Sequence, residues 1–100
     1  MNRIYRITPT ANRELEELLQ NLATIASFNT SDRFLKRLNQ KFTKIAAFPN
    51  LGKARPEWGD SYQSLPIDNY VIVYRVTEEM VEILRIISGY RDMDDLFTED

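Results

Sequence analysis

The chain has 100 residues, of which 43% are hydrophobic, and this combination predicts one small globular domain. It contains no cysteine and no histidine, which excludes disulfides, thiol nucleophiles and the usual structural zinc sites. The net charge of −2 gives no bulk attraction to nucleic acid. The sequence has neither a membrane-length apolar run nor the features of a signal peptide, so we expect a cytoplasmic protein. We expect it to have no cofactor and no metal.

The first strand and the first helix are predicted near the N-terminus. Residues 4–7 follow a short β-type pattern, and Thr8 and Pro9 then supply a helix cap and a proline at the first helical position. Apolar residues recur at intervals of three and four through residues 15–26, which is typical of an amphipathic helix. The run of Asn, Thr, Ser and Asp at residues 29–32 predicts the end of this helix and the cap of the next.

The second helix is predicted to carry an apolar face and a basic face. Its apolar face is formed by Phe34, Leu35, Leu38, Phe42, Ile45 and Phe48. Basic residues share another face at helical spacing, and we call them the basic stripe: Arg33, Arg37, Lys41 and Lys44. This stripe is either a solvated helix face or a docking face for an acidic partner. The charge distribution fits both readings, because residues 1–58 carry a net charge of +5 and residues 59–100 a net charge of −7.

A loop and three strands are predicted after the second helix. Pro49 and Gly52 end the helix, and a loop continues to residue 59. The pattern then alternates from residue 60, and Pro66 is expected at the end or edge of a strand. Residues 70–92 contain two runs rich in Val, Ile and Tyr that are interrupted at Glu78 and Glu79, which predicts a β-hairpin.

The fold class predicted from this order is α+β. A strand, an antiparallel helical hairpin and a three-stranded antiparallel stretch complete one sheet in the order β-α-α-β-β-β. We expect residues 1–100 to form a single domain with an acidic tail at about residues 93–100.

Ordered motifs in the second half resemble those of the ParE branch of the ParE/RelE toxin superfamily. The matching residues are Pro49, Gly52, Arg55, Leu65, Pro66, Tyr70, Tyr74, Arg75, residues 82–86, Gly89, Arg91 and Asp92. Each motif is weak alone, and the ordered set is fairly specific. The chain differs from many members of the superfamily in having Ser88 where they carry His before the glycine.

The resemblance also tests whether the chain could cleave RNA. Members of the RelE branch cut ribosome-bound messenger RNA with basic residues and a tyrosine spread over the sheet. Their two lysines correspond to Tyr62 and Ser64, one arginine to Val71, a second arginine to Arg91 and the tyrosine to Phe97. Only Arg91 keeps the required chemistry, and one cation cannot replace three basic groups in stabilising a phosphoryl transition state. The resemblance therefore favours a toxin that is not an enzyme.

The function implied by the resemblance is inhibition of growth by binding a target, which for the ParE branch is DNA gyrase. The implied partner is a cognate antitoxin, ParD-like or of another family, bound in a hetero-oligomer, with no membrane and no sequence-specific nucleic acid. The alternatives are a RelE-like ribosome-dependent ribonuclease and an inactive homologue that only binds its antitoxin.

Site residues for these contacts can be named as candidates. Large side chains near one end of the sheet are candidates for target binding: Arg55, Trp58, Arg91, Leu96 and Phe97. The basic stripe is the candidate for antitoxin binding. Other interpretations are structural: Trp58 could cover a core edge, Arg91 and Asp92 could tie the strand end to the Arg55 loop, and Arg75 and Arg85 are expected to pair with Glu82 or another carboxylate across the sheet.

Overall fold

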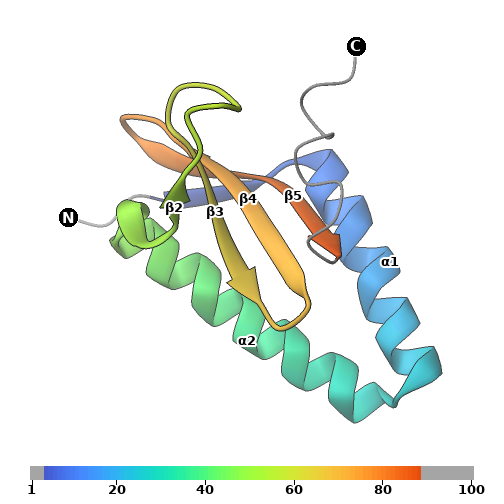
Figure 1. The fold of residues 1–100 in the computed structure, drawn as a ribbon. Coiled ribbons are helices and arrows are strands. Elements are labelled where there is room, and N and C mark those ends of the chain that lie inside the picture. The colour runs from blue at the N-terminus through green and yellow to red at the C-terminus, as the bar shows by residue number, and fades with distance from the viewer. Residues whose placement is uncertain (1–3, 89–100) are drawn as a thin grey trace.

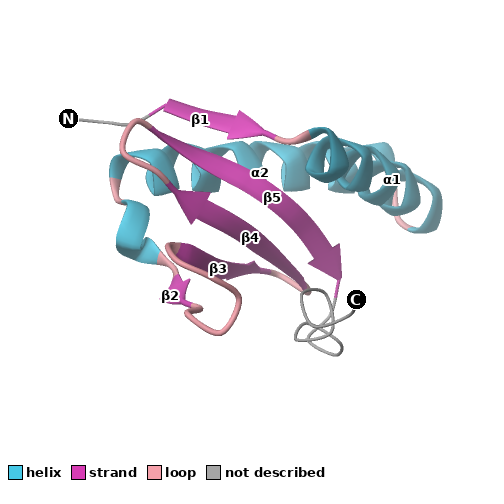
Figure 2. Cartoon of the chain, turned by 90° about the horizontal axis from the view of Figure 1, so that it is seen from above, coloured by secondary structure: helices cyan, strands magenta, loops and turns pink. Residues whose placement is uncertain are grey.

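A computed structural model describes residues 4–88 and shows a sheet with two helices on one side (Figures 1 and 2). Its elements in chain order are β1 (Ile4–Ile7), α1 (Pro9–Ile25), α2 (Phe28–Ala47), the 3-10 helix η1 (Pro49–Leu51), β2 (Lys53–Ala54), β3 (Tyr62–Ile67), β4 (Tyr70–Val76) and β5 (Met80–Ser88). The predicted α+β class and its element order are confirmed, and the two-residue strand β2 is an addition to them.

The strands of the described region form one sheet in the order β1-β5-β4-β3-β2. The pairs β2–β3, β3–β4 and β4–β5 are antiparallel, whereas β1 is parallel to β5. A parallel neighbour needs a crossover connection, and the helical hairpin supplies it. The first strand therefore lies beside the last one, and the hairpin of β4 and β5 forms the centre of the sheet.

The outer edge of β3 is interrupted by a proline. The backbone N–H of Arg55 donates to the carbonyl of Tyr62 over 2.8 Å, so Tyr62 directs its backbone groups away from β4. Alternate residues of a strand direct these groups to the same side, which places those of Ser64 and Pro66 on this edge as well. Pro66 has no N–H, and the edge therefore lacks a donor where β2 no longer covers it.

The start of α1 agrees with the sequence, and the start of α2 does not. The Thr8 hydroxyl accepts a hydrogen bond from the N–H of Ala11 over 3.2 Å, as expected of the cap. The predicted turn at residues 29–32 is wrong, because these residues lie in the first turns of α2. Ser27 is the cap instead, and its hydroxyl accepts from the N–H of Thr30 over 3.0 Å.

The main core lies between the helices and the sheet. Leu38, Phe42 and Ile45 of α2 are fully buried, as are Ile72 and Tyr74 of β4. The predicted core positions of Leu38 and Phe42 are therefore confirmed.

Three apolar residues at the helix ends do not join this core. Phe48, expected on the apolar face of α2, is 68% exposed, because it follows the last helical residue. Ile25 and Ala26, expected to continue the apolar face of α1, are exposed at its C-terminal end. Within residues 4–88, neither helix is both long and apolar enough to cross a membrane.

The two strand arginines find different partners. Arg75 pairs with Glu82 on the neighbouring strand through Nε over 3.1 Å, as expected. Arg85 instead reaches Glu14 of α1, with 2.8 Å between its Nε and the carboxylate. The same carboxylate accepts the backbone N–H of Ile86 over 2.9 Å, at a point of β5 beyond the end of β1. Glu14 thus satisfies a strand donor that β1 does not reach.

Candidate functional site

The face of the sheet opposite the helices has a small apolar cluster of its own. Trp58, Val71 and Val73 are buried there, and Tyr62, Leu84 and Ile87 pack against them. The loop between β2 and β3 brings Trp58 onto this face. We call this surface the open face, because no helix of the described chain covers it (Figure 2).

Arg55 is held rigidly at the border of the open face. Its Nε donates to the Ser64 hydroxyl over 2.9 Å, and its Nη1 lies 3.4 Å from a Glu57 carboxylate oxygen. The guanidinium carbon lies 4.9 Å from the centre of the Trp58 ring. A planar cation stacked on an aromatic ring and hydrogen-bonded at Nε has little rotational freedom. The side chain is 18% exposed, and it lines a hollow at the surface.

Trp58 is 9% exposed, which agrees with the interpretation that it covers a core edge. Arg55 covers its ring, and Val71 and Val73 share its apolar cluster. A partner on this face would thus meet Arg55 before it met the indole.

A buried tyrosine fixes the segment that carries Lys53 and Arg55. The Tyr74 hydroxyl accepts from the N–H of Gly52 over 2.9 Å and donates to the carbonyl of Pro49 over 2.7 Å. Burial raises the pKa of Tyr74, and the hydrogen bond from Gly52 partly opposes this shift. Gly52 is required for space, because a Cβ atom would lie 2.6 Å from the Ser64 carbonyl oxygen and 2.7 Å from the tyrosine hydroxyl.

A charged group occupies another part of the sheet, near the turn between β4 and β5. Glu82 accepts from Arg6 over 2.7 Å and also from Arg75. The hydrogen bonds donated by Arg6 and then by Arg75 lower the pKa of Glu82, and the hydrogen bonds that Arg75 donates to Glu82 raise the pKa of Arg75. These charges satisfy one another, so we treat the group as structural.

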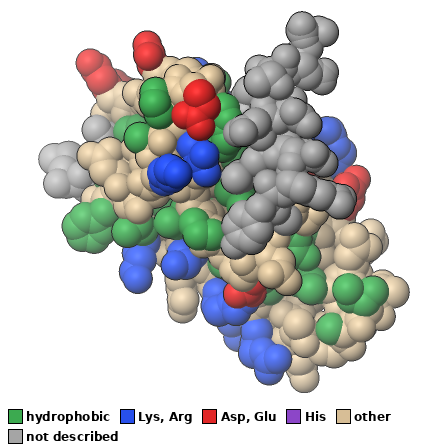
Figure 3. Space-filling view, viewed as in Figure 1, with side chains coloured by type: hydrophobic (Ala, Val, Ile, Leu, Met, Phe, Trp, Pro, Cys, Tyr) green, Lys and Arg blue, Asp and Glu red, His purple; other side chains and the backbone are tan. Residues whose placement is uncertain are grey.

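The basic stripe lies along α2, where Figure 3 shows Lys and Arg side chains gathered. Arg37 forms an ion pair with Asp68 of the turn between β3 and β4. Within residues 4–88, Arg33, Lys41 and Lys44 have no ion pair. A hollow of about 310 Å³ adjoins the stripe, and Arg33, Phe34, Arg37 and Tyr70 contribute to its lining. The stripe thus offers several uncompensated cations beside apolar and aromatic walls.

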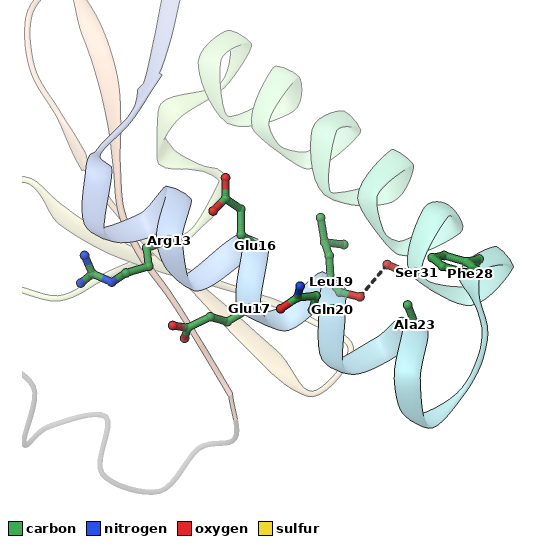
Figure 4. A pocket seen from close by; sticks show the side chains of 8 residues that line it. All are labelled: Arg13, Glu16, Glu17, Leu19, Gln20, Ala23, Phe28 and Ser31. Atoms are coloured by element: carbon green, nitrogen blue, oxygen red, sulfur yellow. Dashed lines mark hydrogen bonds between the residues drawn. The ribbon is translucent and has the colours of Figure 1, made fainter.

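A groove lies between the two helices (Figure 4). Its volume is about 560 Å³, and its lining combines the apolar Leu19, Ala23 and Phe28 with polar and charged residues that include Glu16 and Glu17. Phe28 is 82% exposed and Ile25 is 78% exposed near the tip of the helical hairpin. Ser31 closes the base of the groove by donating its hydroxyl to the Leu19 carbonyl over 2.9 Å. The sequence pattern did not indicate Phe28 as a site residue, because it predicts the turn after this position.

The structure describes three of the positions that correspond to RelE-type catalytic groups, and these three lie together on the open face. Tyr62 and Val71 belong to the apolar cluster around Trp58, and Ser64 bonds Arg55. None of these three positions therefore carries a cation. The other named candidates, Gly89, Arg91, Asp92, Leu96 and Phe97, lie outside the described residues. Among the residues that the structure does describe, no group of three or more acidic side chains could hold a metal ion.

Comparison with known proteins identifies the family of the chain. Residues 5–93 match the family described as the ParE toxin of the type II toxin-antitoxin system parDE. Toxin ParE1 of Mycobacterium tuberculosis is 26% identical over 95 residues, which cover 94% of this chain and 97% of that toxin. Toxin ParE3 of Caulobacter vibrioides is 26% identical over 89 residues, which cover 89% of this chain and 88% of that toxin.

Solved structures share the fold of this chain. A structure of the chromosomal ParDE system of P. aeruginosa superposes with a TM-score of 0.74 at 16% identity, covering 88% of this chain and 97% of the other. The RelBE2 toxin-antitoxin complex of Mycobacterium tuberculosis gives a TM-score of 0.61 at 25% identity, covering 88% of this chain and 99% of the other. The chain therefore belongs to the ParE family of toxins of type II toxin-antitoxin systems.

Proposed function

We infer that this toxin stops growth by binding a protein target, DNA gyrase, without breaking a bond itself, and that a cognate antitoxin neutralises it. The composition of the open face is the observation that supports a toxin without enzymatic activity, and membership of the ParE family supports gyrase as the target. Tyr62, Ser64 and Val71 stand where a RelE-type ribonuclease would need two lysines and an arginine. Stabilising the charge of a phosphoryl transition state requires several cations aimed at one point, and these residues supply none.

The open face does offer side chains of the kind that bind a protein target. Arg55 is rigid and partly exposed, and tryptophan and arginine are enriched at positions that dominate binding energy. We propose Arg55, Trp58, Arg91, Leu96 and Phe97 as the residues that contact the target.

The antitoxin is proposed to bind the helical side. The basic stripe presents three cations without an ion pair in the described chain, and the two hollows beside and between the helices are partly apolar. A segment with acidic and apolar residues that folds on binding would complement such a surface. Antitoxin and target would then use different faces of the toxin. Toxin and antitoxin would form a hetero-oligomer, and a binding titration would give its stoichiometry.

The decisive experiment measures DNA supercoiling by purified gyrase in the presence of the purified toxin. We expect inhibition, with accumulation of cleaved DNA, at micromolar toxin, and we expect Arg91→Ala to weaken both. Toeprinting of a translated message is the matched assay for ribonuclease activity, and no cuts are expected in the ribosomal A site. A toxin that leaves gyrase unaffected and cuts the message would contradict the proposal and favour the RelE-like alternative. A toxin inactive in both assays that still binds its antitoxin would be the inactive homologue.

A further inference from the structure

A small hollow lies beside Arg55 at the outer edge of β3. Its volume is about 360 Å³, with Leu51, Pro66 and Val71 among its apolar lining residues and Lys53, Arg55 and Ser64 as its polar ones. No carboxylate of the described chain lines it. The hollow therefore combines an apolar surface with two cations and no carboxylate in its lining.

The Arg55 guanidinium is already oriented for an anion. Ser64 and Trp58 fix its position, and its weak contact with Glu57 involves a carboxylate that is 52% exposed and lies outside the hollow. Its Nη2 makes no hydrogen bond or ion pair within residues 4–88. Because the side chain is held before binding, little conformational entropy is lost when a carboxylate arrives.

Lys53 supplies the second charge of the hollow. It is exposed, and it forms no ion pair in the part of the chain that the structure describes. In the β2–β3 ladder it stands opposite Ser64, the residue that holds Arg55. The ladder and the Tyr74 hydrogen bonds keep both cations on one rigid segment.

We propose that this hollow binds a short peptide segment of a protein partner in which a carboxylate residue adjoins an aliphatic one. The carboxylate would bind between Arg55 and Lys53, and the aliphatic side chain would pack on Pro66 and Val71. One part of this inference rests on the proposed function, namely that the segment belongs to the target of the toxin.

A nucleic acid fits the same hollow poorly. Two cations neutralise few phosphates, whereas nucleic-acid binding depends on releasing many counterions. Binding of single strands also needs an exposed aromatic face for base stacking, and the Trp58 ring is buried beneath Arg55. The apolar lining favours an aliphatic side chain over a base or a sugar.

Fluorescence anisotropy with the full-length toxin tests the proposal. The probe is a labelled octapeptide of alternating Glu and Leu, compared with a Gln and Leu peptide, a Glu and Ser peptide and an eight-residue oligothymidylate. We expect the Glu and Leu peptide to bind most tightly. Lys53→Gln should weaken it about fivefold, and Arg55→Gln about tenfold or more. Lys36→Gln, an exposed lysine on α2, is the matched control and should leave the affinity unchanged.

Several outcomes would overturn the proposal. Equal binding by the parent and Lys53→Gln would do so, and Lys53 is exposed, so this variant does not endanger the fold. Tighter binding of oligothymidylate would assign the hollow to nucleic acid. Stronger competition by an unlabelled peptide of residues 89–100 than by the unlabelled probe peptide would assign it to the chain's own end. None of these measurements involves gyrase, so a different cellular target would leave their result unchanged.

Discussion

The two faces of the sheet differ in what covers them. The helical face buries a continuous core of large side chains, including Leu38, Phe42 and Tyr74, each of them fully buried. Within residues 4–88, the open face is covered by one loop, and its buried cluster consists of Trp58 and two valines. Stability therefore comes mainly from the helical face. In the described chain the open face has a smaller interior, and Arg55 lies at its border.

The largest effect is expected from truncating the core of the helical face. Leu38→Ala or Phe42→Ala should lower the free energy of unfolding by about 2–5 kcal/mol, because each leaves a cavity in a closely packed region. Leu84→Ala on the open face should cost less, because its side chain is only partly buried. Urea denaturation followed by circular dichroism measures the difference. If both core variants unfolded at the same urea concentration as the parent, the assignment of the core face would be wrong.

A smaller loss of stability is expected at Gly52, which packs against the Tyr74 hydroxyl. Gly52→Ala places a Cβ atom 2.6 Å from a backbone carbonyl oxygen, which cannot move without shifting β3. We expect a cost of about 1–3 kcal/mol, as for other overpacked sites. Lys53→Ala, one residue later and exposed, serves as the control and should change stability by less than about 0.5 kcal/mol. Equal stability of the two variants would show that the loop adapts freely.

A pair of surface variants separates recognition on the two faces. Arg55→Lys keeps the charge and loses the Nε hydrogen bond and the planar stacking on Trp58, so inhibition of gyrase should require roughly tenfold more toxin. Lys44→Gln in the basic stripe should weaken antitoxin binding and leave inhibition unchanged. Titration calorimetry with the antitoxin and supercoiling assays give both values. If each variant affected both activities equally, the proposed division between the faces would fail.

The smallest effect concerns pH. The pKa of Glu82 is lowered in the folded chain by Arg6 and Arg75, so its stabilising contribution is complete above the unfolded pKa of about 4.5 and is lost as the pH falls through the folded value. Glu82→Gln should therefore flatten the fall in stability below about pH 4.5. Thermal melts between pH 3 and pH 7 test this, and a fall as steep as that of the parent would exclude a role for Glu82.

Periodicity was sufficient to predict the elements that bury one face. The spacing of Leu38 and Phe42 indicated the core of α2, and the Val- and Ile-rich runs around Glu78 and Glu79 indicated the central hairpin. These signals are local. Each depends on residues within one element, so no knowledge of the fold is needed.

Other features depend on contacts between distant residues. Arg85 and Glu14 are 71 positions apart, and the pairing of Arg55 with Ser64 and Trp58 depends on how one loop folds back. The cap of α2 was misplaced for another reason. Ser27 precedes four further residues that could all cap a helix, and the sequence does not rank them. The candidate site was therefore predicted in part, with Arg55 and Trp58 named but their stacking unforeseen.

The proline at the outer edge of β3 bears on how copies of this toxin behave at high concentration. An exposed strand edge can recruit the matching edge of another molecule and extend into a fibre. At Pro66 the incoming strand would find a carbonyl but no N–H, and the two residues of β2 already occupy the neighbouring part of the ladder. Chain-to-chain growth from this side of the sheet is thereby discouraged.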